Sequence, residues 1–171
     1  MRRFAVFLFA VFLLATGLLA GTLTFNDSQS GLVIHYPKGW RVDTDTPTFA
    51  IENFPAAKRP PQLLVPAGKA RIMVSAPEVK SVEELIERDR LSEKNGYTTR
   101  QTQVKTSEGS IAATEIRLDQ NRVIPEGHTL IDVFVVRGRV YETYLLYRGA
   151  GEKAKYEKIY YQILGTVKFP H

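Results

Sequence analysis

The sequence contains no cysteine. Disulfide bonds, zinc sites with thiolate ligands, Cys-x-x-Cys redox chemistry, a cysteine nucleophile and a lipid carried on an N-terminal cysteine are therefore all excluded. Histidine is also scarce, with three residues in 171, so there is little material for a metal site built from imidazoles. No Gly-x-Ser-x-Gly, His-Glu-x-x-His, P-loop or Gly-x-Gly-x-x-Gly motif occurs. The sequence thus predicts a protein that is not an enzyme and has no cofactor.

Basic residues are only slightly in excess over acidic residues. The chain has 23 basic and 18 acidic residues, and apolar residues make up 44%, which is typical of a globular protein. Arg2 and Arg3 are the only charged residues among the first twenty, so the rest of the chain carries 21 basic and 18 acidic residues, a net charge of +3. This weak excess requires no nucleic-acid partner, and none is predicted.

The first twenty residues have the layout of a secretory signal. A basic start at residues 1–3 is followed by an uninterrupted apolar run from Phe4 to Ala15 and then by small residues. We therefore predict a signal peptide at residues 1–20, one domain at residues 21–171, and a periplasmic or extracellular location. The alternative is an uncleaved membrane anchor, because an apolar stretch over residues 4–23 reaches the length of about 20 residues that a spanning helix needs.

Hydrophobic periodicity in residues 21–171 predicts a β-rich domain with two helices. We expect strands near residues 32–36, 49–54, 71–76, 97–104, 111–118, 129–136 and 140–147, and a last edge strand at 166–169. A capping box at Ser81 to Glu84 predicts a helix running to about Asn95. Its apolar face is thin and Leu91 falls on the opposite side, so we expect the last turns to be exposed or distorted. The second helix has a full apolar stripe made of Tyr156, Ile159, Tyr160, Ile163 and Leu164.

Two strands indicate how these elements are layered. In residues 111–118, Glu115 and Arg117 make one side polar, whereas the strand at 129–136 is apolar on both faces. A strand that is apolar on both faces needs cover on both faces. The predicted fold is therefore α+β, a three-layer α/β/α sandwich with a central antiparallel sheet.

The chain resembles the Mog1p/PsbP-like superfamily. The resemblance is carried by residues 31–40, an extended segment that closes in Tyr36-Pro37-Lys38-Gly39-Trp40, and is supported by residues 81–95, 108–118 and 156–169. It implies the same α/β/α sandwich and the role of an exported binding or accessory module. Family members include extrinsic photosystem II subunits, a nuclear transport factor that binds a small GTPase, and exported bacterial proteins. Because the family has no shared active site, no catalytic residue is carried over.

A long proline-rich connection at residues 55–69 is the predicted docking surface for a protein partner in the envelope. Within it, Leu63, Leu64 and Val65 are predicted to make apolar contacts, and Lys58 and Arg59 to steer an acidic partner. The alternative is a connection that folds back over an open edge of the sheet.

Other residue types favour structural roles. Trp40 and Tyr36 are predicted to anchor the core rather than stack on a ligand. His35 is expected to be a satisfied or exposed histidine. The tyrosines at 141, 144, 147, 156, 160 and 161 are expected to pack in the core.

Asp132 is the unusual residue, because it lies in the middle of the two-faced strand, where an unpaired charge is costly. We expect it to be partly exposed or paired, with Arg117 or Arg139 supplying the opposite charge. An envelope enzyme with a site near Asp132 and His128 is the alternative function, and a structural protein held in the membrane by its N-terminal segment is a third.

Overall fold

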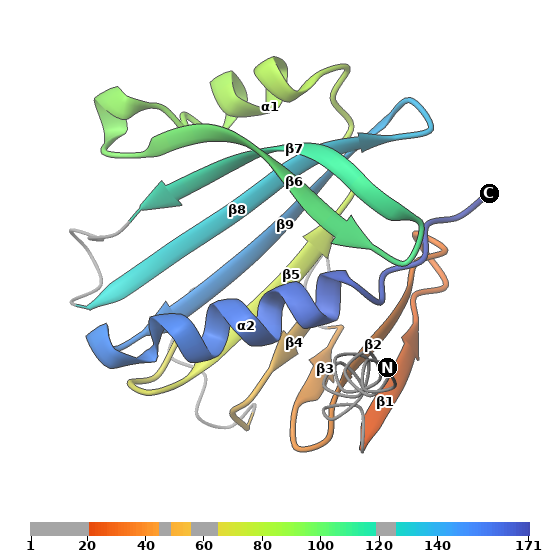
Figure 1. Cartoon of the computed structure of the whole chain (residues 1–171), viewed down its shortest axis with the longest axis vertical. Helices are drawn as coiled ribbons and strands as arrows, with labels where there is room; N and C mark the ends of the chain where they lie inside the picture. The colour runs from red at the N-terminus through yellow and green to blue at the C-terminus, as the bar shows by residue number, and fades with distance from the viewer. Residues whose placement is uncertain (1–20, 45–48, 56–64, 119–125) are drawn as a thin grey trace, which may run out of the picture.

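The structure, a computed structural model, describes residues 21–44, 49–55, 65–118 and 126–171. In this part of the chain, seven antiparallel strands form one sheet and two more form a separate hairpin (Figure 1). The strand order in the large sheet is β3-β4-β5-β9-β8-β7-β6, so β9 lies at its centre. The hairpin is made of β1 and β2.

The strands are β1 (Thr22–Asn26), β2 (Val33–Pro37), β3 (Arg41–Asp43), β4 (Ala50–Glu52), β5 (Ala70–Ser75), β6 (Thr98–Thr106), β7 (Gly109–Leu118), β8 (Gly127–Val136) and β9 (Arg139–Arg148). The helices are α1 (Val82–Arg88) and α2 (Lys153–Leu164), with short 3-10 turns η2 (Glu93–Asn95) and η3 (Ala150–Glu152). Strands β8 and β9 are joined by a tight turn, in which Arg137 and Gly138 both have positive φ angles.

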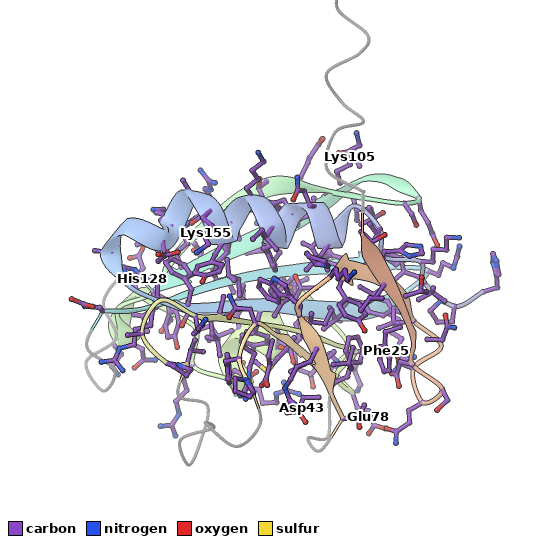
Figure 2. The ribbon with its side chains drawn as sticks, turned by 90° about the horizontal axis from the view of Figure 1, so that it is seen from below. Phe25, Asp43, Glu78, Lys105, His128 and Lys155 are labelled. Atoms are coloured by element: carbon purple, nitrogen blue, oxygen red, sulfur yellow. The ribbon has the colours of Figure 1, made fainter. Side chains whose placement is uncertain are left out.

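The two helices cover opposite faces of the sheet. Leu130 and Phe134 of β8 pack in the core beneath α2, whereas Ile131 and Val133 pack with Leu85 of α1. Figure 2 shows the sheet nearly edge-on with α2 along one side. The two-faced strand is thus covered on both faces, and the prediction of a three-layer α/β/α sandwich is confirmed.

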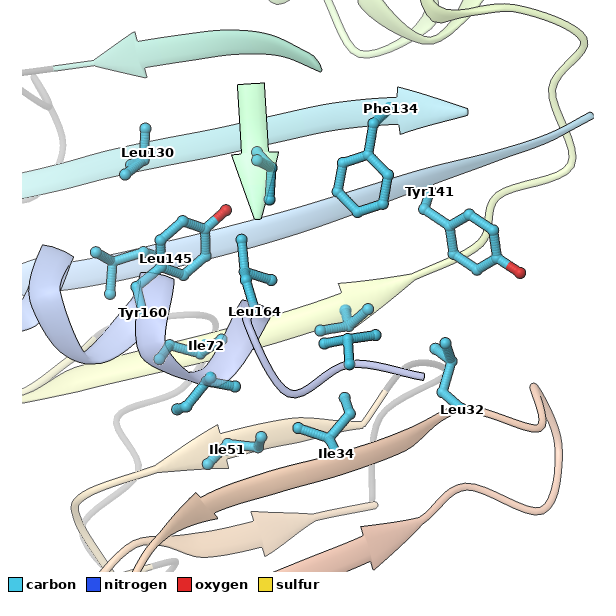
Figure 3. Close-up of a cluster of buried hydrophobic side chains, with 14 of the residues drawn as sticks. Leu32, Ile34, Ile51, Ile72, Leu130, Phe134, Tyr141, Leu145, Tyr160 and Leu164 are labelled. Carbon is cyan, nitrogen blue, oxygen red and sulfur yellow. The ribbon is translucent and has the colours of Figure 1, made fainter. Parts of the chain in front are cut away.

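The larger core lies between the sheet and α2 (Figure 3). Tyr160 and Leu164 of α2 meet Leu145, Leu130 and Ile72 of the sheet, and all of these side chains are fully buried. The apolar stripe predicted for this helix is therefore its packing face. Burial of such side chains contributes about 1.5–3 kcal/mol each to the free energy of unfolding.

Residues 166–169 differ from the prediction of an edge strand. They make one antiparallel bridge, Val33 with Lys168, to the β1–β2 hairpin instead of adding a strand to the large sheet. Val167 and Phe169 are nevertheless buried in the large core. The segment therefore joins the hairpin to the sandwich.

Helix α1 is shorter than predicted. It ends at Arg88, and Arg90 takes a positive φ of 56°, which turns the chain back toward the sheet. The backbone amide of Leu91 donates to the carbonyl of Ile86 at 2.9 Å, and the Leu91 side chain is buried. Of the two expectations for the last turns, exposure or distortion, the structure shows distortion, because the helix ends early and the turn at Arg90 places Leu91 in the core.

The polar face of β7 is largely buried, whereas the polar face of a simple amphipathic strand would be exposed to solvent. Glu115 is 1% exposed, since its side of the strand faces α2 rather than solvent. Its carboxylate is held by three side chains of the surrounding elements, as described below. A polar strand face can be buried when its charges are paired.

Within the described residues, no helix is both long and apolar enough to cross a membrane. Residues 1–20, with the predicted signal peptide or anchor, lie outside the described part of the chain.

Candidate functional site

A pocket lies on the face of the sheet that α1 covers only in part. With seven residues, α1 packs over β7 and β8 through Leu85 and leaves side chains farther along the sheet uncovered. One cross-strand row there is Met73, Tyr144 and Ile131, which are register partners on β5, β9 and β8. Leu146 and Thr129 form the next row. These two rows make the floor of the pocket.

The walls come from segments next to the sheet. Asp89, Leu91 and Tyr97 lie in the connection from α1 to β6, and Val65 precedes β5. The pocket has a volume of about 470 Å³. Its remaining lining residues are Gly127, His128, Tyr147 and Arg148. Because most of this lining is aliphatic or aromatic, we call it the apolar pocket.

Asp89 and Tyr144, which line the apolar pocket, already have hydrogen-bond partners. Arg88 donates two hydrogen bonds to the Asp89 carboxylate, at 2.7 and 3.0 Å. The Tyr144 hydroxyl donates to Glu142 at 3.0 Å, and Ser75 donates to the other oxygen of that carboxylate at 2.5 Å. Burial, together with the neighbouring Glu142 charge, raises the pKa of Tyr144 well above its usual value. Tyr144 therefore stays neutral and acts as a hydrogen-bond donor.

A second group of polar side chains, of which all but Arg100 are buried, lies on the opposite face of the sheet, beneath α2. Thr143, Asp132, Glu115 and Arg100 are successive register partners on β9, β8, β7 and β6. We call them the polar row. Asp132 is fully buried, and one of its oxygens accepts a hydrogen bond from Tyr160 of α2 at 2.9 Å.

The two carboxylates of the polar row differ in their partners. Glu115 accepts from Arg100, Arg117 and Tyr161, and Arg117 also donates to Glu157 of α2. Asp132 has only Tyr160, and its second oxygen has no partner among the described residues. The expectation that Arg117 or Arg139 pairs with Asp132 is therefore wrong, because Arg117 is held by Glu115 and Glu157.

These partners separate the two pKa values. Burial raises the pKa of Asp132 to about 7, and the facing Glu115 charge adds to this effect. Burial also opposes ionisation of Glu115, but its bonds to Arg117 and Arg100 outweigh the cost and lower its pKa to about 2. Unequal titration is expected for two carboxyl groups placed directly opposite each other.

His128 and Asp132 do not form an acid–base pair. Four residues of extended strand separate them by about 13 Å. The His128 ring stacks on Tyr147 with ring centroids 4.8 Å apart, and its Nδ1 atom is buried without a hydrogen-bond partner in the described part of the chain. Among those same residues, no group of three or more potential ligands could hold a metal ion.

Of the five residues that were assigned docking roles, only Val65 falls inside the described ranges. Val65 is 4% exposed and lines the apolar pocket, so its side chain is not available as a surface contact. Lys58, Arg59, Leu63 and Leu64 lie outside the described residues. The docking role of the loop stays a prediction for those four.

The aromatic residues follow the structural interpretation. Trp40 is half-buried and meets Tyr156 edge-on, with ring centroids 6.3 Å apart. His35 is paired with the Thr24 hydroxyl at 2.9 Å. Four of the six tyrosines between 141 and 161 are fully buried, and Tyr144 and Tyr161 are half-buried.

Sequence reasoning did not find the apolar pocket. A signal was available, since β9 and β8 are apolar on both faces and the first helix has few apolar residues with which to cover one of them. Tyr97 and Met73 could not be assigned to a site, because their neighbours are set by strand register and by the turn after α1.

The fold is thus an antiparallel α/β/α sandwich with an apolar pocket on one face of its sheet. This architecture is the one that the resemblance to Mog1p/PsbP-like domains predicts, and that prediction is confirmed for the fold.

Comparison with solved structures gives likenesses at low sequence identity. A Bacteroides thetaiotaomicron protein has a TM-score of 0.50 at 17% identity, over 88% of this chain and 49% of that one. Cyanobacterial PsbP (CyanoP) from Synechocystis has a TM-score of 0.49 at 14% identity, over 91% of this chain and 96% of that one. No protein-family model matches the chain, and no curated protein matches it in sequence. The likeness to the Bacteroides protein is one of fold.

Proposed function

We propose that the chain is an exported, non-catalytic binding module that acts as an accessory to a protein partner in the cell envelope or outside the cell. The observation that carries this proposal is that the buried carboxyl group with a raised pKa lies on the opposite face of the sheet from the apolar pocket. Asp132, whose pKa is raised by burial, lies beneath α2, whereas the pocket on the other face is lined mainly by apolar side chains. A cavity of this kind suits binding rather than acid–base chemistry.

Export is supported by the basic, apolar and small-residue segments of residues 1–20. The test is the N-terminal sequence and mass of the protein purified from cell fractions. We expect a form that begins between Leu18 and Leu23 and that fractionates outside the cytoplasm.

The matched control for export replaces Leu13 with arginine, which interrupts the apolar run and should hold the full-length protein in the cytoplasm. Full-length wild-type protein found only in the membrane would instead establish the anchor formed by residues 4–23.

The partner is expected to recognise the loop that holds Lys58, Arg59, Leu63 and Leu64. Cross-linking in intact cells, followed by capture from the envelope fraction, would compare wild type with Leu63→Ser and Leu64→Ser. We expect these variants to lose the captured partner while the melting temperature stays within about 1–2 °C of wild type, as for surface substitutions.

The control for this capture is Lys105→Glu, at an exposed position on β6. It should retain the partner. Equal capture by the wild type and the two loop variants would show that the loop is not the docking surface.

A further inference from the structure

We infer that the apolar pocket binds a small, uncharged, predominantly apolar molecule that carries one carbonyl or hydroxyl group. This inference goes beyond the proposed binding of a protein partner and does not depend on it. It rests on three properties of the pocket, namely its size, the engagement of its charges, and two lining hydroxyl groups without a protein partner.

The size and lining fit a small organic molecule. Cavities of about 300–1,000 Å³ are typical of ligand sites, and an apolar cavity of about 150 Å³ holds benzene. At about 470 Å³, the pocket has room for roughly 15–20 non-hydrogen atoms on the benzene scale. Met73, Ile131, Leu146 and Leu91 would pack against its apolar body.

The engaged charges select against an ionised ligand. Asp89 is neutralised by the two hydrogen bonds from Arg88. Arg148 already has an interaction partner. A ligand charge brought into this pocket would lose its hydration without gaining an opposite charge in return, and that loss is costly.

The lining hydroxyl groups define the polar part of the ligand. Tyr97 and Thr129 line the pocket, and neither side chain makes a hydrogen bond within the described residues. Burial and the Asp89 charge raise the pKa of Tyr97, so its phenol remains a neutral donor. One carbonyl or hydroxyl on the ligand would satisfy these groups.

The test uses prodan, an uncharged naphthalene with one ketone whose emission shifts to the blue in apolar surroundings. The anionic probe anilinonaphthalene sulfonate serves as the comparison. We expect saturable prodan binding to the full chain, weaker binding of the sulfonate, and a two- to tenfold loss of prodan affinity in Tyr97→Phe. The matched control Tyr36→Phe, on the β1–β2 hairpin, should bind prodan like wild type.

Filling the pocket tests its location. Leu146→Trp and Met73→Trp should each abolish prodan binding, whereas Leu23→Trp, at an exposed position on β1, should not. The melting temperature of each variant checks that it is folded, and two filling variants guard against the failure of one.

Four outcomes would overturn the inference. The first is the absence of saturable binding by wild type. The second is prodan binding that persists in both folded filling variants, and the third is sulfonate binding that is as tight as prodan binding. The fourth is a dimer in solution that Leu146→Trp dissociates, which would identify a second copy of the chain as the occupant of the pocket.

Discussion

Asp132 and Glu115 show how strand register creates two different carboxyl groups from similar residues. They are directly opposite each other on β8 and β7, a separation at which like charges repel strongly. The arginines approach from β6 and β7, on the side of Glu115, while Asp132 is covered by Tyr160 of α2. Ionisation is therefore concentrated on Glu115, and Asp132 is left to titrate near neutral pH.

The first prediction concerns Asp132→Asn. The folded-state pKa of Asp132, about 7, lies above its ordinary value of 3.8. Between these values the folded state binds more protons than the unfolded state, so the free energy of unfolding of wild type falls as pH rises. The asparagine variant lacks this dependence. Between pH 4 and pH 8, the free energy of unfolding of the variant should therefore rise by about 3–4 kcal/mol relative to that of wild type, as measured by urea denaturation.

Glu115→Gln provides the companion measurement. Loss of the facing charge should lower the pKa of Asp132 and shift the pH-dependent loss of stability toward acid. Groups that face Asp132, including Arg100, Arg117 and Tyr161, remain present in both proteins. If Asp132→Asn and wild type have parallel pH profiles, Asp132 is ionised in the folded protein and the explanation given for its raised pKa is wrong.

At the scale of the elements, the length of α1 determines how much of one sheet face is covered. Ser81 caps the helix by accepting a hydrogen bond from the amide of Glu84 at 3.2 Å, and the Glu84 side chain accepts from the amide of Lys80 at 2.8 Å. The predicted capping box is therefore present, except that the Glu84 side chain accepts from the amide of Lys80 rather than from that of Ser81. At the other end, the turn at Arg90 brings Leu91 under the helix.

The second prediction follows from this cap. Ser81→Ala leaves the amide of Glu84 without its acceptor and should lower the free energy of unfolding by about 0.5–1 kcal/mol, as for other N-cap losses. Chemical denaturation measures the change. Ser92→Ala is the matched control, because Ser92 precedes η2 without a capping side-chain bond and should cost less. Equal losses in the two variants would rule out a specific contribution of the cap.

At the scale of the whole molecule, the β1–β2 hairpin packs on the sandwich through the fully buried Ile34 and through further aromatic and hydrogen-bonding contacts. Phe25 meets Phe49 with ring centroids 4.9 Å apart, and the Thr166 hydroxyl bonds to the backbone of His35. Trp40 follows the hairpin and contacts Tyr156 of α2. The contacts made by Thr166 and Tyr156 connect residues that are more than a hundred positions apart in the sequence.

The third prediction is that Trp40→Ala lowers the free energy of unfolding by about 2–4 kcal/mol. Complete truncation of a buried aromatic costs about 3–5 kcal/mol, and Trp40 is only half-buried. Thermal or urea denaturation measures the loss. Leu23→Ala, at a side chain that is 45% exposed, should change stability by less than about 0.5 kcal/mol. A Trp40→Ala protein that melts like wild type would show that this contact does not hold the hairpin to the sandwich.

Local patterns in the sequence were sufficient for much of the fold. Alternating residues in 129–136 predicted a strand covered on both faces, and the stripe from Tyr156 to Leu164 predicted the packing face of α2. Both are periodicities within one element, so no knowledge of neighbouring elements is needed.

The order of elements and the α/β/α layering were thus determined by the sequence itself, because the spacing of apolar residues indicates whether an element is buried on one face or on both. The tertiary structure alone decided what faces each side chain. It set Asp132 against Glu115 and Tyr160, turned Leu91 inward, and brought Tyr97 to the row that holds Met73 and Tyr144. Those neighbours come from strand register and from a turn after α1, both of which depend on contacts between residues far apart in the chain.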